Sequence, residues 1–178
     1  MTAICVYCAS GPVPRHHLEL ATELGTEIGS RGHTLVSGGG NVSSMGAVAR
    51  ATRAAGGHTI GVIPKALVHR EMADVDADEL VVTDTMRERK KIMDERADAF
   101  IALPGGIGTL EELFETWTGR YLGMHDKPVM LLDPDGFFTP LSDWLRSLVP
   151  SGFVRTESLA ALETYSSVGS AVDRAEKG

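Results

Sequence analysis

The sequence has little with which to build a disulfide or a metal site, because only two of its 178 residues are cysteines. Cys5 and Cys8 lie three positions apart in a predicted strand, and strand side chains alternate between faces, so the two thiols should lie on opposite sides of the sheet. No second Cys-x-x-Cys accompanies them and the six histidines are scattered. We therefore predict no metal site and no cofactor.

The sequence also lacks a long apolar run and an excess of basic charge. No stretch approaches the roughly 18 apolar residues of a membrane-spanning helix, and no basic-then-apolar leader precedes the first strand, so we expect a cytoplasmic protein without membrane contact. The 17 basic residues are outnumbered by 24 acidic ones, and the net charge is −7. This balance argues against a nucleic-acid partner, but a few N–H groups and one Arg suffice for a small anion.

What is present is an ordinary globular composition, 43% hydrophobic and 23% charged, which fits a single domain over residues 1–178. Short apolar runs alternate with helix-period segments. Strands are predicted at 3–8, 34–36, 59–63, 80–82, 99–103, 128–132 and, more weakly, 159–162. Helices are predicted at about 15–30, 44–55, 84–96, 109–122, 137–148 and 168–176. Continuous apolar strands between helices predict an α/β fold, a Rossmann-like doubly wound parallel sheet with helices on both faces.

In such sheets, ligands bind beyond the carboxyl ends of the strands. Three loops lie there, at 9–12, 37–41 and 104–109. The last reads Pro-Gly-Gly-Ile-Gly-Thr and opens a helix, and a glycine turn at a helix N-terminus forms an anion site. It is neither a Walker A loop nor a dinucleotide fingerprint, which favours a nucleoside monophosphate. The alternative is a glycine-rich turn without a ligand.

Two features beside these loops each allow two interpretations. Thr109-x-x-Glu112 matches a capping box, in which Glu112 folds back onto the start of the helix. The same carboxylate, with Glu111, could instead oppose positive charge on a sugar next to the anion site. The triple-glycine loop is either a second point of close backbone approach or the lead-in to a helix capped by Ser43 or Ser44, and both can hold at once.

The predicted helix 84–96 places two cations where apolar residues are expected. Arg89 and Lys90 lie on or beside the face that carries Met86 and Met93, whereas the other charged residues fit a solvated side. Burying an unpaired cation costs several kcal/mol, so we predict a carboxylate or phosphate partner for both. The connection that contains Glu71, by contrast, reads only as surface chain.

Together these residues resemble the LONELY GUY phosphoribohydrolases, a family long mislabelled as lysine decarboxylases. The family signature, Pro-Gly-Gly-x-Gly-Thr-x-x-Glu, is met in full by residues 104–112. Further matching segments follow in order along most of the chain, at 4–10, 38–46, 61–65, 85–90 and 122–128.

The resemblance implies a homodimer with active sites near the subunit interface. It implies hydrolysis of a cytokinin riboside 5′-monophosphate, and of AMP, to the free base and ribose 5-phosphate. The family's catalytic pair corresponds to Arg89 and Glu112. Its substrate contacts correspond to Glu71, Arg89, Lys90, Gly105, Gly106, Ile107, Gly108, Thr109, Leu110, Glu111 and Thr118, and the loops after the first two strands add Ser10, Gly39, Gly40 and Met45.

Two departures from the family pattern stand out. Ser43 and Ser44 replace a common Gly-Leu pair, and Arg87 replaces a His. Two rival functions remain. One is a pyridoxal-phosphate lysine decarboxylase, which needs a Schiff-base lysine. The other is a non-catalytic nucleotide-binding module on the same fold.

Overall fold

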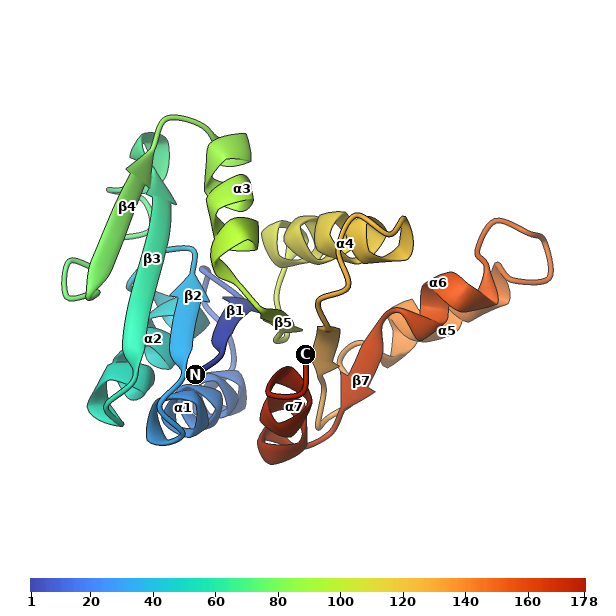
Figure 1. Ribbon diagram of the computed structural model, residues 1–178, viewed down its shortest axis with the longest axis horizontal. Helices are drawn as coiled ribbons and strands as arrows, with labels where there is room; N and C mark the ends of the chain where they lie inside the picture. Colours follow the sequence, from blue (N-terminus) through green and yellow to red (C-terminus); the bar gives the residue numbers. More distant parts are fainter.

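The protein, described over all 178 residues by a computed structural model, is built on one seven-stranded sheet in which every pairing is parallel (Figure 1). The strands are β1 (Ala3–Tyr7), β2 (Thr34–Ser37), β3 (His58–Pro64), β4 (Glu79–Thr83), β5 (Ala99–Ala102), β6 (Val129–Leu132) and β7 (Glu163–Tyr165). Their order is β4-β3-β2-β1-β5-β6-β7. The chain thus winds outward from β1 to β4, then returns to β5 and winds to the other edge. The switch point, where ligands bind in such sheets, lies between β1 and β5.

Helices cover both faces of the sheet, as the alternation of apolar runs predicts. They are α1 (Arg15–Ser30), α2 (Ser43–Ala54), α3 (Met86–Arg96), α4 (Ile107–Tyr121), α5 (Thr139–Ser147), α6 (Thr156–Ala160) and α7 (Val168–Ala175), with a short 3₁₀ turn η1 (Lys65–Leu67) after β3. Apolar residues of α1, α2 and α7 form the core on one face, and those of α3, α4 and α5 form the core on the other. The doubly wound α/β class is confirmed.

The two cysteines lie on opposite faces, as strand alternation predicts. Cys5 is buried in the core beneath α3 and α4, and Cys8 is buried in the core beneath α1 and α2. Burial raises the pKa of both thiols, so neither is a thiolate at neutral pH. No group of three or more His, Cys, Asp or Glu side chains comes together to hold a metal ion.

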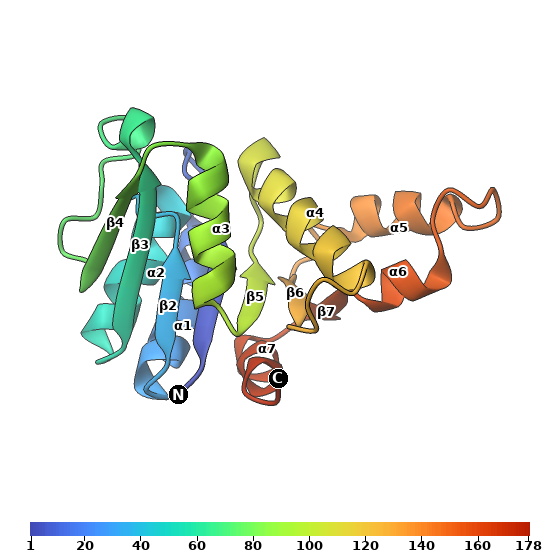
Figure 2. The ribbon, with the colours of Figure 1, turned by 45° about the horizontal axis from the view of Figure 1, so that its top comes forward.

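The seventh strand and one helix differ from the sequence prediction. Residues 159–162, predicted as a strand, lie at the end of α6 and in the turn after it, and β7 follows at Glu163. Leu159 and Leu162 pack against the core from there, so an apolar run too short to show a helical period was misassigned. Figures 1 and 2 show α5, α6 and the loop between them extending outward beyond β7. None of the helices combines the length and the apolar content needed to cross a bilayer.

Candidate active site

A pocket of about 590 Å³ opens at the switch point, between the loops that follow β1 and β5. The first turn of α4 forms one side, and side chains from α2, α3 and the β3–β4 connection complete it. Of the residues predicted to act on the substrate, it gathers Ser10, Met45, Glu71, Arg89, Gly105, Gly106, Ile107, Gly108, Thr109, Glu111 and Glu112. Segments up to about a hundred positions apart in the sequence therefore meet at one site.

Five predicted contacts do not line this pocket: Gly39, Gly40, Lys90, Leu110 and Thr118. The two glycines lie beneath the backbone of residues 71–74. Lys90 donates to Glu111 and Glu115 instead, and although burial lowers the pKa of its ammonium, these carboxylates outweigh that effect and raise it. Leu110 packs against the core. Thr118 lines a second cavity of about 620 Å³ beside α4.

The glycine loop after β5 has the form of an anion site. Helix α4 begins at Ile107 with Gly106 as its N-cap and no side-chain cap, so the amides of the first turn have no partner within the helix. A Cβ at Gly106 or Gly108 would meet no atom within 4 Å, which means that this backbone faces open space. A capping box with Glu112 would need Thr109 as the N-cap, but the N-cap is Gly106, three residues earlier. The capping-box interpretation is therefore wrong.

Gly105 has a different task within the same loop. A Cβ there would lie 2.1 Å from Oγ1 and 2.6 Å from Cβ of Thr109, which is buried. Glycine is therefore needed so that the first turn of α4 can fold back against the end of β5. The sequence motif combines this packing requirement at Gly105 with the exposed backbone of Gly106 and Gly108 that follows it.

Glu112 is a carboxyl of the pocket whose pKa is strongly altered. Its side chain is only partly exposed, and burial raises the pKa of its carboxyl to about 7, although the nearby Arg89 guanidinium acts in the opposite direction. The negative charges of Glu111 and Glu71 add to the increase. A carboxyl whose pKa lies near neutrality is suited to exchange protons or to carry a switchable charge.

Arg89 is only 4% exposed, as its place on the apolar face of α3 predicts. Its Nη2 donates to the carbonyl oxygen of Gly38 at 3.1 Å and lies 3.7 Å from Oε2 of Glu71. The expected carboxylate partner is therefore present, and the interpretation of Glu71 as mere surface chain is wrong. Nε of Arg89 and Oε2 of Glu71 have no hydrogen-bond partner, although buried polar groups normally have one. A ligand in the pocket could satisfy both.

The triple-glycine loop makes room for Arg89. A Cβ at Gly38 would lie 1.9 Å from Nη2 of Arg89, so any side chain there would displace the guanidinium. The serine caps predicted after this loop are not formed: Val42 is the N-cap of α2, and the hydroxyls of Ser43 and Ser44 are buried without partners. Ser43 has a φ of +51°, a conformation that glycine adopts more easily. This explains why the family pattern commonly has Gly at the position of Ser43.

The apolar wall of the pocket was not predicted from the sequence; it is formed by Pro12, Val13, His17, Met86 and Phe137. The rings of His17 and Phe137 meet edge to face with centroids 5.8 Å apart. Burial and the neighbouring His16 lower the pKa of His17, so its ring is neutral at pH 7. Only the position of these residues after strand ends could have indicated them, because they come from three unrelated parts of the chain.

Comparison with known sequences gives a consistent result. Residues 45–175 match a family described as "Possible lysine decarboxylase". A protein of Mycobacterium tuberculosis is 57% identical over 95% of this chain and 90% of its own length, and one of Mycobacterium marinum is 54% identical over 98% and 94%. A rice protein is 46% identical over 87% of this chain and 64% of its own. All three are named cytokinin riboside 5′-monophosphate phosphoribohydrolases.

Comparison with solved structures shows that the fold serves several functions. The molybdenum cofactor binding protein of Rippkaea orientalis superposes with a TM-score of 0.76 and 26% identity, covering 99% of this chain and 96% of its own. The DNA processing protein A of Helicobacter pylori superposes with a TM-score of 0.62 at 14% identity, covering 99% and 80%. The second likeness shows the fold alone, so function must be argued from the pocket.

Proposed function

We propose a reaction for this pocket on the premise that the chain belongs to the LONELY GUY family of cytokinin riboside 5′-monophosphate phosphoribohydrolases. Like its relatives, the chain is an enzyme that cleaves the N-glycosidic bond of a nucleoside 5′-monophosphate. The products are the free base and ribose 5-phosphate. The observation that carries the proposal is the juxtaposition of an anion site, at the start of α4, with the Glu112 carboxyl one turn further on.

The phosphate docks on the amides at the start of α4. The backbone at Gly106 and Gly108 is open to the pocket, and the positive end of the helix dipole favours an anion there. Binding energy from this non-reacting end of the substrate holds the anomeric carbon in place. The apolar wall at the other side of the pocket takes the base and its N6 substituent.

Glu112 acts on the sugar. Cleavage of an N-glycosidic bond develops positive charge on the ribose, as in glycoside hydrolysis, and an ionised Glu112 opposes that charge and orients the attacking water. Arg89 anchors the ribose or phosphate with its free Nε–H, and its guanidinium attracts the Glu71 carboxylate and so helps to position it.

An assay for base release tests this function. The protein is incubated separately with AMP and with isopentenyladenosine monophosphate, and the products are separated by chromatography. We expect free adenine and isopentenyladenine, each with an equal amount of ribose 5-phosphate. Tight binding of both nucleotides without any free base would instead identify a non-catalytic binding module.

The rate should fall as the pH is lowered through about 7. The reaction as proposed needs the ionised form of Glu112, whose pKa burial raises to about 7, so activity is lost on the acid side of that value. The pH profile of kcat measures this. Ionisation of the substrate phosphate, near pH 6, also affects the profile. In Glu112→Gln the inflection caused by the phosphate should remain in the residual activity, whereas the inflection near pH 7 should be absent.

Lysine decarboxylation has no support in the pocket. Pyridoxal-phosphate chemistry needs a lysine that forms a Schiff base with the cofactor, and none of the residues that line the pocket is a lysine. Lys90, the lysine next to the site in sequence, is engaged by Glu111 and Glu115. An absorbance scan without a pyridoxal band would agree with this conclusion.

The homodimer implied by the resemblance is part of the proposal. Thr118 lies outside the pocket of its own chain, yet its counterpart in the family contacts the substrate, so a second copy is the source of that contact. Ile107, Leu122 and Met124 are 88%, 64% and 78% exposed at the two ends of α4, which is the surface such a copy would cover. A sedimentation mass of one chain would contradict this arrangement. The cytoplasmic location and the absence of a nucleic-acid partner stay predictions.

A further inference from the structure

Residues 71–74 of the β3–β4 connection are fastened to the triple-glycine loop. The N–H of Asn41 donates to the carbonyl oxygens of Glu71 at 3.1 Å and Met72 at 2.8 Å. The N–H of Asp74 donates to the carbonyl oxygen of Gly39 at 2.8 Å. Ala73 forms an isolated antiparallel bridge with Gly40. The connection thus covers the loop that makes room for Arg89.

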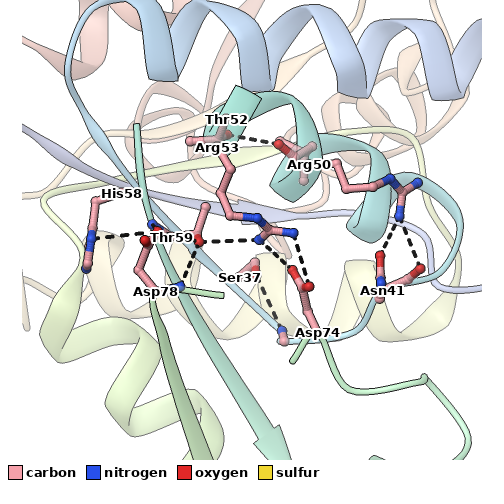
Figure 3. A network of polar contacts seen from close by, with 11 residues as sticks. Ser37, Asn41, Arg50, Thr52, Arg53, His58, Thr59, Asp74 and Asp78 are labelled. Carbon is pink, nitrogen blue, oxygen red and sulfur yellow. Dashed lines mark hydrogen bonds and ion pairs between the residues drawn. The ribbon is translucent and has the colours of Figure 1, made fainter. Parts of the chain in front are cut away.

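A partly buried ion pair ties this segment to α2, and Figure 3 shows the Arg53 guanidinium pointing towards the Asp74 carboxylate. Asp74 is 2% exposed and accepts two hydrogen bonds from Arg53 of α2, from Nη1 to Oδ2 at 2.8 Å and from Nη2 to Oδ1 at 3.1 Å. Arg53 also donates to Oγ1 of Thr59 in β3, at 3.3 Å. Thr59 in turn donates through its N–H and its hydroxyl to Asp78, so the connection is held at two points four residues apart.

The other contacts of the segment are mainly local backbone hydrogen bonds, from the N–H of Glu71 to the carbonyl oxygen of Leu67 at 2.8 Å and from the N–H of Ala73 to the carbonyl oxygen of Val68 at 2.9 Å. Met72 has a φ of +48°, a strained backbone conformation that persists only when surrounding contacts enforce it. The side chains of His69, Arg70, Met72 and Val75 are exposed, so they add no apolar anchor. A bidentate Arg–carboxylate pair is the strong and directional contact that such a segment requires.

The segment positions one side chain of the site. Three residues before Asp74, Glu71 reaches into the pocket, where its Oε2 lies 3.7 Å from Nη2 of Arg89. Its backbone is packed so closely on the glycine loop that a Cβ at Gly40 would lie 3.0 Å from the carbonyl oxygen of Glu71. A shift of the segment would therefore move the Glu71 carboxylate relative to Arg89.

We propose that Arg53 and Asp74 are a positioning pair for the reaction, which set the place of the Glu71 carboxylate against Arg89 without touching the substrate. This inference rests on the proposed function. It predicts that breaking the pair changes nucleotide affinity and the titration of the pocket, beyond any loss of stability. Neither residue lines the pocket.

The test compares Asp74→Asn and Arg53→Lys with the wild-type protein. Asp74→Asn should lower kcat/KM for AMP about 10-fold to 10²-fold, mainly by raising KM, because small displacements of positioned groups have effects of this size. Arg53→Lys keeps the charge but not the two-pronged contact, so it should lose activity less. If Asp74→Asn does not fold, Arg53→Lys alone decides.

The pH profile separates positioning from general destabilisation. The charged side chains that act on Glu112 are Arg89 and Lys90 of α3, Glu111 of α4, and Glu71 of the connection. Because Glu71 raises the pKa of Glu112, moving it away should shift the acid limb of the kcat profile of Asp74→Asn to lower pH. The limb should return towards its wild-type position in Arg53→Lys.

Glu163→Gln is the matched control. It weakens the ion pairs of Glu163 with Arg174 of α7, at 2.8 and 3.0 Å, and with Arg120 in the last turn of α4, at 3.4 Å. Both lie around β7, at the far edge of the sheet. The substitution should lower the unfolding midpoint but leave KM and the pH profile unchanged. The inference is overturned if Asp74→Asn and Arg53→Lys match this control in both measurements. If the wild-type protein releases no base, the proposed function fails instead, and the dissociation constants of AMP for the same variants decide the inference.

Discussion

Replacing Glu112 with Gln should lower kcat for base release by about 10²-fold to 10³-fold and leave the dissociation constant of AMP within a few-fold of the wild-type value. The amide keeps the shape of the side chain but cannot oppose the positive charge that develops on the ribose. The amides that hold the phosphate belong to a separate turn of α4 and are unaffected. Single-turnover kinetics and calorimetric binding measure the two quantities separately. Near-normal turnover by this variant would remove Glu112 from the mechanism.

The same substitution should stabilise the fold at alkaline pH. Burial raises the pKa of Glu112 from its ordinary 4.5 to about 7. Its ionised form is thus disfavoured in the folded protein, so the wild-type protein loses stability as the pH rises from 4.5 to 7. A neutral Gln avoids this loss. We expect the free energy of unfolding to increase by up to about 3 kcal/mol at pH 8 and to change little at pH 4.

Replacing Gly38 with Ala should lower kcat/KM by about 10²-fold although Gly38 lies outside the pocket. The added Cβ would lie 1.9 Å from Nη2 of Arg89, and its other near contacts are 3.0 Å from Cζ of Arg89 and from Sδ of Met45. All three atoms belong to side chains, so the strain is relieved by displacing the guanidinium rather than the backbone. The stability cost of such overpacking should be about 1–3 kcal/mol.

A double-mutant cycle identifies the cause of this loss. If Gly38→Ala acts through Arg89, it should cost little further activity in an Arg89→Ala background. Gly169→Ala in α7 is the control, because its Cβ would meet only Arg31, at 3.9 Å, and a helical alanine should stabilise by about 0.5–1 kcal/mol. Additive losses in the cycle, or full activity of Gly38→Ala, would show that the position of the guanidinium does not matter.

Most of the predicted residues that the structure gathers in the pocket are those whose signal in the sequence is local. The anion loop needs only a strand, a glycine turn and a helix start in succession, and residues 104–109 show all three within one segment. Arg89 was found because a cation on an apolar helix face conflicts with its surroundings, wherever the partner lies. Leu110 and Thr118 were assigned by the family pattern, and the structure places both outside the pocket.

The errors concern contacts between distant segments. The connection around Glu71 has no periodicity, and its place over the glycine loop depends on Arg53 and Asp74, which are 21 positions apart. Phe137 enters the pocket because Asp133 accepts hydrogen bonds from the N–H groups of Phe137 and Phe138 and so closes the turn after β6. The capping interpretations of Glu112 and of the serines failed for a local reason, because the N-caps of α4 and α2 are Gly106 and Val42.

By itself, the sequence determined the class of fold, the strand that ends at the anion loop, and the chemistry that this loop can bind, because hydrophobic period and glycine–helix junctions act over a few neighbouring residues. Only the tertiary structure decided which side chains face that loop. Burial that raises the pKa of Glu112, the space at Gly38 for Arg89, and the position of Glu71 all arise from packing between elements. No single segment contains the information for them.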